Sequence, residues 1–560
     1  MKLDKVFWTR AAWVTPIVLL ATIWVMSRVG SVLPKILGDE LIYSMDARKL
    51  APAAAAVPNY FFNFVFSSTN FCGYGFYSCA KGLNLLFLIG LGIVVYLTSR
   101  LFAKPGISFY LALIIFVGPI SSYVSYFSPD LMFFFATSII LYFLIKQDSN
   151  SKSLRWILLG LGVGVDALIK PHALFLILPL AAYIIYLARR EKGIDLGWAA
   201  LRILIALGAT FAIKLGVGLA IAGSRGLGLF GGSYDAAATQ SLSGSSAGVG
   251  QTTSWSFANL SWVGPFGLEL TFHIAFLVIF FGTPLATLAM GRVRLNQKIR
   301  FHDTYSRLRL LSAAVTITMV LVSAIYVVIS AGWGETLDYR VMVRYYEYAL
   351  IFLPILLLPT LKAENQIGKF RSWALVIFPV LILAIALPFM STKLPPLFTD
   401  SALIASVLKS GLTLYTFAVI SLAFLIYLIV KPEKGAKAWL FGYLPIIVLT
   451  FAISSYVNMT IPSSHVGMYT HSSRWTHDNL TDAQKHNLKI YGNVKQNVQA
   501  AQLWVDDPSV TGEALSPGST IDLSLLPNNS YVLIIGDLKA SGTARIVHRE
   551  QSFVVVQIQH

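Results

Sequence analysis

The chain has 560 residues, of which 56% are hydrophobic and 12% are charged, and its mean hydropathy is +0.68. Because a soluble domain carries about twice that charged fraction, the composition excludes an ordinary soluble protein. The formal net charge of +17 does not indicate a nucleic-acid partner. No nucleic-acid-binding motif is present, and the basic residues gather in short loops, as the positive-inside rule of membrane proteins predicts.

Apolar runs of roughly 20 residues recur along the chain, and because this length crosses a bilayer they predict a polytopic membrane protein. The run after the basic start MKLDKVFWTR continues to Val32, which indicates a retained first helix rather than a cleavable signal peptide. We predict about thirteen transmembrane helices. Their approximate bounds are 12–33, 83–101, 106–126, 130–146, 154–169, 171–188, 198–222, 266–289, 310–331, 348–361, 372–390, 403–430 and 438–456.

The charged loops between these helices predict their orientation. With a cytoplasmic N-terminus, strict alternation places the basic clusters on the cytoplasmic side. These clusters include Lys2 and Arg10, Arg100 and Lys104, Arg189 and Arg190, and the basic residues between Arg292 and Arg309. An odd number of helices then puts the C-terminus outside. Dividing 154–188 differently, where KPH interrupts it, would reverse the later loops.

Two domains are predicted, a transmembrane domain over 1–456 and a C-terminal domain over 457–560. The first has outer segments at 34–82, 223–265 and 332–347. The glycine- and serine-rich stretch within the second of these, SLSGSSAGVGQTTS, forms either a flap over a site or a plain linker.

The C-terminal domain differs from the rest of the chain in composition. It contains the stretches SYVLIIGD, TARIVH and SFVVVQIQ among proline, glycine and asparagine turns, which is the pattern of short strands. The predicted fold class is therefore an all-α polytopic membrane protein with a small extracytoplasmic α/β or β domain at its C-terminus.

The two cysteines, Cys72 and Cys79, both lie in the first outer loop, in FCGYGFYSC. In an oxidising compartment they either form one disulfide across a short loop or remain free thiols, and the sequence leaves both alternatives open. No histidine neighbours them, so a metal site at this position is not expected.

Charged residues that remain close to a bilayer usually have a function, and a set of them falls on the predicted outer side. The set includes Asp39, Glu40, Asp46, Arg48 and Lys81 in the first loop, Asp130 at a helix start, Lys170 and His172 in a turn, and Glu335, Asp338, Arg340, Arg344 and Glu347 in 332–347, where aromatic residues such as Tyr345 lie between them. A carboxylate can act as general base, arginines can hold a phosphate, and aromatic rings suit the faces of sugars. Together they indicate a substrate with a lipid tail, a phosphate and a sugar.

Each of these residues also has a structural interpretation. Acids such as Asp39, Glu40 and Asp130 stabilise helix N-termini. Arg340 and Arg344 can anchor a helix end to lipid headgroups, and the neighbouring tyrosines suit an aromatic belt at the membrane interface. The charged turn before the sixth predicted helix can simply be a hydrated turn.

Several motifs, in this order and on this side, resemble the GT-C integral-membrane glycosyltransferases, which include the protein O-mannosyltransferases and the lipid A aminoarabinose transferases. They are the acidic pair in GDELIY, the apolar stretch NYFFNFVFSS leading to Lys81 in CAKGLNLLF, the acid in SPDLMFFFATSIILYF, the turn Lys170-Pro171, and RVMVRYYEYALIFLP. The resemblance is best over the first 190 residues or so. One departure is Gly82, because prolines often follow the lysine in this class.

The resemblance implies an inverting transfer from a polyprenyl-phosphate sugar donor, in a bacterium undecaprenyl phosphate. It makes Asp39 the catalytic base and gives Glu40 the role of orienting the acceptor or supporting Asp39. The donor phosphate would be held by Lys81, Arg340 and Arg344, and the sugar, the acceptor or a cation would be contacted by Asp130, Tyr43, Asp46, Lys170, His172 and Tyr345. Some members of the class use a divalent cation such as Mg²⁺ or Mn²⁺ and others do not, so the metal remains open.

The expected partners are the lipid-linked donor, an envelope glycan or glycolipid acceptor such as lipopolysaccharide, and the bilayer of a bacterial inner membrane, with the C-terminal domain in the periplasm. One alternative is a flippase for lipid-linked saccharides, although such transporters often contain internal repeats and none is evident here. Another is an O-antigen ligase or polymerase, a class that typically lacks an acidic pair directly after the first helix.

Overall fold

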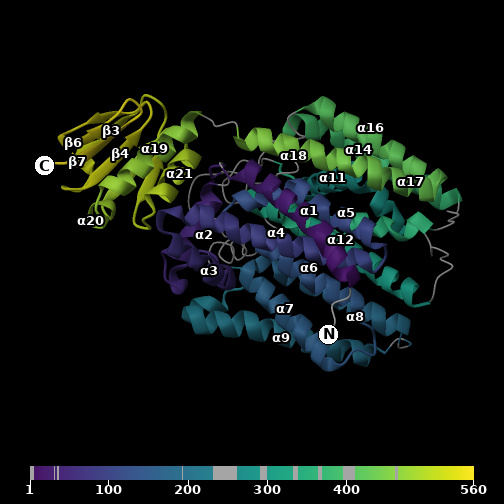
Figure 1. The fold of residues 1–560 in the computed structure, drawn as a ribbon. Coiled ribbons are helices and arrows are strands. Elements are labelled where there is room, and N and C mark those ends of the chain that lie inside the picture. Colours follow the sequence, from purple (N-terminus) through teal and green to yellow (C-terminus); the bar gives the residue numbers. More distant parts are fainter. Residues whose placement is uncertain are drawn as a thin grey trace.

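The computed structural model describes residues 5–30, 32–34, 37–191, 193, 195–230, 262–289, 299–331, 339–362, 369–394, 410–460 and 464–559. A large helical part continues into a smaller domain at one end (Figure 1). The sequence-based expectations for a flap within 223–265 and for the start of the loop 332–347 fall mostly outside the described residues.

Helices dominate the larger part. They are α1 (Lys5–Val29), α2 (Leu37–Arg48), α3 (Tyr60–Ser67), α4 (Phe76–Arg100), α5 (Pro105–Val117), α6 (Asp130–Lys146), α7 (Ser153–Ile169), α8 (Ile177–Glu191), α9 (Leu196–Ala222), α11 (Val263–Ala289), α12 (Ile299–Ala331), α13 (Glu347–Leu350), α14 (Lys369–Lys393), α16 (Gly411–Val430), α17 (Pro432–Ala438) and α18 (Leu444–Thr460). Short helical turns join several of them, among them η2 (Ser68–Gly75), η3 (Pro119–Ser125), η4 (Pro171–Leu176), η7 (Val343–Tyr345) and η8 (Leu353–Leu357).

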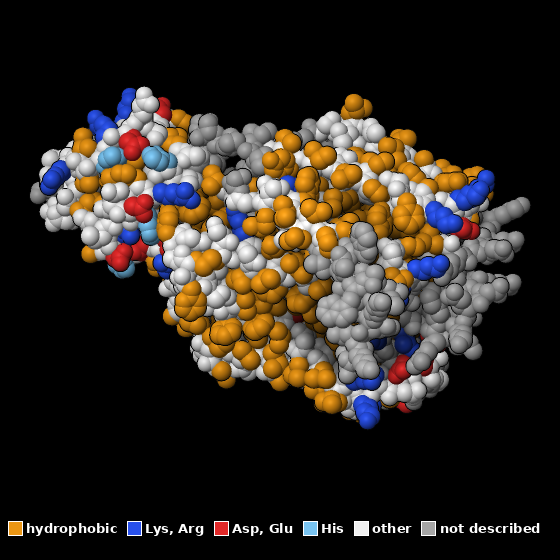
Figure 2. All heavy atoms as spheres, in the orientation of Figure 1, with side chains coloured by type: hydrophobic (Ala, Val, Ile, Leu, Met, Phe, Trp, Pro, Cys, Tyr) orange, Lys and Arg blue, Asp and Glu red, His pale blue; other side chains and the backbone are white. Residues whose placement is uncertain are grey.

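Within the described residues, eight helices are long and apolar enough to cross a membrane, or nine if the bent pair Pro105–Val117 and Pro119–Ser125 forms one span. Figure 2 shows a broad hydrophobic surface over this part, with charged side chains gathered toward the two ends of the molecule. These features identify an integral membrane protein. The count of thirteen spans is not confirmed, because stretches such as 348–361 break into short helical turns instead of forming one long helix.

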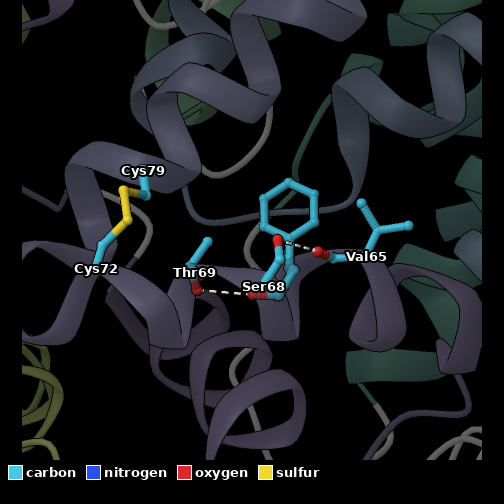
Figure 3. Close-up of a disulfide and its surroundings, with 6 residues drawn as sticks. Val65, Ser68, Thr69, Cys72 and Cys79 are labelled. Atoms are coloured by element: carbon cyan, nitrogen blue, oxygen red, sulfur yellow. Dashed lines mark hydrogen bonds between the residues drawn. A yellow bond between two sulfur atoms is a disulfide. The ribbon is translucent and has the colours of Figure 1, made fainter.

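The first predicted outer loop is largely helical. Asp39 and Glu40 lie in the first turn of α2 and Arg48 in its last turn, an arrangement that suits the helix dipole. After α3, η2 leads into α4, and a disulfide joins Cys72 to Cys79 across this junction. Figure 3 shows this disulfide, and nearby the hydroxyls of Ser68 and Thr69 donate to carbonyl oxygens of the preceding turn.

The C-terminal domain contains both helices and strands. Its elements are α19 (Ser464–Asn479), α20 (Asp482–Lys485), β1 (Leu488–Gly492), α21 (Lys495–Val505), β2 (Thr511–Ala514), β3 (Thr520–Asp522), β4 (Tyr531–Ile535), β5 (Lys539–Ser541), β6 (Ala544–Arg549) and β7 (Phe553–Ile558). The main sheet has the order β2-β1-β4-β7-β6; β1 is parallel to β2 and β4, whereas β7 is antiparallel to β4 and β6. The prediction of a small C-terminal sheet domain is therefore confirmed, in its α/β form.

Candidate functional site

Asp130 lies at the centre of a buried group of charges. Its side chain has no exposed surface, because it begins α6 in the interior of the helical part. Lys170, between α7 and η4, donates to Oδ1 of Asp130 at 2.6 Å. Arg344, in η7, donates from Nε to Oδ2 at 2.9 Å, and its Nη2 lies 2.8 Å from the same oxygen. Both cations are nearly fully buried, so this carboxylate is paired on both of its oxygens.

Arg344 also joins a second acid to this group. Its Nη1 donates to Oδ2 of Asp39 on α2 at 2.7 Å. The Asp39 side chain is 46% exposed, whereas that of Asp130 is 0% exposed. We call Asp39, Asp130, Lys170 and Arg344 the charged cluster. Within it, Asp39 is the carboxylate that is open to solvent, and Arg344 holds it in place.

Glu40 follows Asp39 directly but points into the protein. Its Oε1 accepts a hydrogen bond from the hydroxyl of Tyr77 at 2.6 Å and another from the backbone N–H of Phe127 at 2.9 Å. The Tyr77 hydroxyl also lies 2.7 Å from the carbonyl oxygen of Ser125. Glu40 thus fastens α2 to α4 and to the turn before α6. The sequence analysis missed Tyr77, since nothing in its local pattern distinguishes it from other interfacial tyrosines.

A small cleft that opens to solvent lies beside the charged cluster. Its lining includes Tyr43, Val57, Lys170, His172 and Phe230. The cleft therefore combines a cluster cation with aromatic rings, and it brings together residues that the sequence analysis proposed from separate segments.

Tyr345 supports the wall of this cleft. Its ring stacks on the imidazole of His172 with centroids 4.6 Å apart, and the Lys170 ammonium lies 5.1 Å from its centre. A cation over an aromatic face is a favourable arrangement, particularly where water is excluded. Tyr345 thus helps to hold both Lys170 and His172 in place.

The structure does not bring Lys81 and Asp46 to the cluster. The Lys81 ammonium donates to the carbonyl oxygens of Val29, Gly30 and Val32 at 2.8–2.9 Å. The buried carboxylate of Asp46 accepts hydrogen bonds from the backbone N–H groups of two loop residues, 56 and 57, at 3.0–3.1 Å. Both side chains therefore brace backbone segments. Arg340 is half-buried on the segment that leads to η7.

The electrostatic environment distinguishes the two cations of the cluster. Burial disfavours the charge of Arg344, but Asp130 and Asp39 outweigh it and raise the pKa of the guanidinium well above its ordinary value. Burial lowers the pKa of the Lys170 ammonium; Asp130 only partly offsets this effect, and the like charge of Arg344 lowers the pKa further. Arg344 is therefore a permanent cation, while Lys170 is the group of the pair that loses its proton first as the pH rises.

The cluster does not fit a resident divalent cation. No group of three or more His, Cys, Asp or Glu side chains within the described ranges could hold a metal ion. Both oxygens of Asp130 already pair with Lys170 and Arg344, and Asp39 shares the same guanidinium. Because Mg²⁺ and Mn²⁺ need several oxygen ligands, such an ion would have to displace these side chains.

Comparison with known proteins yields only distant structural similarity. No family model matches the chain, and no curated protein matches it in sequence. It is similar to the archaeal oligosaccharyltransferase AglB from Archaeoglobus fulgidus in complex with an inhibitory peptide and a dolichol-phosphate, with 11% identity and a TM-score of 0.40 over 94% of this chain and 70% of that one. The chain is also similar to the oligosaccharyltransferase of the same organism in complex with Zn and sulfate, with 12% identity and a TM-score of 0.41 over 93% of this chain and 68% of that one. The candidate site therefore rests on its own geometry.

Proposed function

We propose that this chain is a GT-C-type glycosyltransferase that moves a sugar from a polyprenyl-phosphate donor to a hydroxyl group of an envelope glycan or glycolipid. The observation that carries the proposal is the charged cluster, in which a half-exposed carboxylate, Asp39, is held by a buried guanidinium, Arg344. A half-exposed base and two cations thus lie side by side, and one of these cations, Lys170, lines a cleft together with aromatic side chains.

The proposed reaction is a single displacement. Asp39 accepts the proton of the acceptor hydroxyl while its oxygen forms a bond to the anomeric carbon of the donor sugar. The bond from that carbon to the phosphate oxygen breaks, and polyprenyl phosphate leaves with the electron pair. Because attack and departure occur on opposite faces of the sugar, the anomeric configuration inverts.

Lys170 and Arg344 have the chemistry to hold the leaving phosphate. An ammonium has three N–H donors, of which Asp130 accepts one from Lys170, and Lys170 lines the cleft. Donors that already point to the place where negative charge develops stabilise a leaving group without reorganisation. In this proposal Asp130 orients the two cations, Tyr43 and His172 contact the sugar, and Glu40 anchors α2.

The cellular setting belongs to the same proposal. The donor lipid would be undecaprenyl phosphate, the membrane a bacterial inner membrane, and the acceptor a periplasmic glycan such as lipopolysaccharide. The N-terminus would then be cytoplasmic and the C-terminal domain periplasmic. We leave Lys81 out of the phosphate site, because its ammonium donates to three carbonyl oxygens.

A transfer assay tests this function. Purified protein in detergent is incubated with radiolabelled polyprenyl-phosphate hexoses or pentoses and a crude envelope-glycan acceptor. We expect label to move to the acceptor with the wild type and with Asp537→Asn, a control in the C-terminal domain, and transfer to fall about 10²–10⁴-fold in Asp39→Asn, the contribution typical of a general base. Full activity of Asp39→Asn would remove this residue from the mechanism. Labelled lipid that crosses vesicle bilayers without transfer would indicate a flippase.

The same assay tests the need for a metal. We expect transfer to continue in excess EDTA, because the positive charge at the phosphate comes from Lys170 and Arg344. Loss of transfer in EDTA that Mg²⁺ or Mn²⁺ restores would show instead that a divalent cation takes part.

A further inference from the structure

The C-terminal domain packs on α2, the helix that carries Asp39, through its own helix α21 (Figure 1). At the end of α2, the guanidinium of Arg48 donates to both carboxylate oxygens of Asp506, at 2.7 and 3.0 Å. Lys49 adds a contact of 2.9 Å to the same carboxylate. The side chains of Arg48 and Asp506 are only 2% and 5% exposed. A buried, two-pronged ion pair of this kind fixes orientation as well as distance.

The backbone of Asp506 presents its carboxylate to α2. Asp506 caps the C-terminus of α21 in the left-handed conformation, with φ of 60°. This conformation is uncommon for a residue other than glycine, although aspartate tolerates it better than most. The end of α21 is therefore shaped to meet Arg48.

A second contact lies at the opposite end of α2. A Cβ atom built on Gly38 would lie 3.1 Å from Oε1 of Gln499, a residue of α21. Gly38 immediately precedes Asp39 in the sequence, so α21 abuts α2 next to the proposed base. The two helices thus meet at both ends of α2, at Gly38 and at Arg48.

Aromatic packing also connects α21 to the acid pair Asp39 and Glu40. The ring of Trp504 on α21 lies 5.6 Å from that of Tyr77, and its carbonyl oxygen accepts a hydrogen bond from the Tyr74 hydroxyl at 3.0 Å. Tyr77 in turn donates to Glu40, the neighbour of Asp39. The remaining members of the charged cluster stand on α6, on the turn before η4 and on η7, which are different elements.

From these contacts we infer that the C-terminal domain positions α2, the helix of the proposed base, with Asp506 as the positioning residue that holds α2, and thereby Asp39, against the other members of the charged cluster. The inference rests on the proposed function for its effect on turnover, while the packing of α21 on α2 stands by itself. The inference predicts different effects on catalysis and on donor binding. Loss of Asp506 displaces the base, whereas Lys170, Asp130 and Arg344 stand on other elements, so kcat falls and binding of the lipid phosphate does not change.

The test compares Asp506→Ala with Asp537→Asn, the control, in the full-length protein. Hydrogen–deuterium exchange of α2 amides, binding of undecaprenyl phosphate and transfer rates are measured on each. We expect faster exchange in α2 but not in α6, unchanged affinity for undecaprenyl phosphate, and kcat lower by about 100-fold, the loss that a small misplacement of a catalytic group can cause. Unchanged exchange in α2, or unchanged kcat despite faster exchange, would overturn the inference.

A second set of variants covers the case in which Asp506→Ala does not fold. Gly38→Leu places a side chain against Gln499, and Gly38→Leu/Gln499→Ala removes the obstacle. Gly82→Leu on α4 is the control, since a Cβ there meets nothing within 4 Å. We expect the single variant at Gly38 to lower kcat and the double variant to restore it. A double variant whose kcat stays low would contradict the positioning of α2 by α21. If the wild type transfers no sugar at all, the proposed function fails, and exchange in α2 alone decides whether α21 holds that helix.

Discussion

The charged cluster and the sheet of the C-terminal domain contain ion pairs of nearly equal length in very different surroundings. Lys170 and Asp130 are 2.6 Å apart with side chains that are 4% and 0% exposed. Lys489 on β1 and Glu513 on β2 are 2.9 Å apart, but their side chains are 32% and 48% exposed. The distance therefore does not indicate how much each pair contributes to stability, whereas its burial does. Water screens the charges of the second pair, and it solvates both side chains if they separate.

The energetic consequences of burial are asymmetric. A buried pair adds little to stability when it is complete, because removing both charges from water costs nearly as much as their attraction returns. Removing one partner is costly, since the other charge is left without compensation. The cluster is accordingly a place where single substitutions have large effects, while the sheet tolerates them. Three predictions test this contrast, from the largest expected effect to the smallest.

Arg344→Ala should have the largest effect on stability. It leaves Asp130 with Lys170 alone and Asp39 without its cation, so we expect the free energy of unfolding to fall by about 3–5 kcal/mol. Chemical unfolding in detergent measures it, with Arg344→Lys as the matched variant that keeps the charge but not the planar fork. A loss below about 1 kcal/mol, the range of surface pairs, would show that the cluster is effectively solvated.

Lys170 should make binding of the lipid phosphate dependent on pH. Because burial lowers the pKa of its ammonium, the positive charge is lost as the pH rises through a value below that of an exposed lysine. We expect affinity for undecaprenyl phosphate to decrease from neutral to alkaline pH in the wild type and to stay constant in Lys170→Arg, whose guanidinium keeps its proton. Equal pH profiles for the two proteins would exclude Lys170 as the titrating group.

Lys489→Met should have the smallest effect. The pair with Glu513 is exposed, so we expect the free energy of unfolding to change by at most about 1 kcal/mol. Thermal unfolding followed by circular dichroism measures it beside Arg344→Ala. A change as large as that of Arg344→Ala would show that the exposure of an ion pair does not decide how much its loss lowers the free energy of unfolding.

The sequence was a good guide to the class of protein and to one part of the candidate site. Apolar runs of bilayer length predict membrane helices because the hydrophobic thickness of a bilayer sets a minimum length, and the short apolar run in SYVLIIGD, which lies among turn residues, predicts a strand, which is β4. The number of spans was harder to predict. A run such as 348–361 is apolar enough for a helix, but its packing into short turns depends on neighbours that local composition does not reveal.

Neighbouring residues show the same limit at the site. Asp39 and Glu40 are adjacent acids in the sequence, and both are plausible catalytic groups there. The structure leaves Asp39 half-exposed beside Arg344 and buries Glu40 against Tyr77 and Phe127. Lys81 likewise looks like a phosphate ligand in the sequence, but its ammonium lies among carbonyl oxygens of the segment after α1. Orientation on a helix and the partners across it decide these differences.

By itself, the sequence determined that the chain is a membrane protein with a small sheet domain, and it supplied the acids, cations and aromatic residues of the candidate site. Local patterns suffice for this, since the length of an apolar run and the turn residues that bound it are properties of short segments. Only the tertiary structure decided which charges meet. Arg344 reaches Asp39 across 305 residues and Arg48 reaches Asp506 across 458, and such pairs form because the packing of distant helices leaves each buried charge a partner.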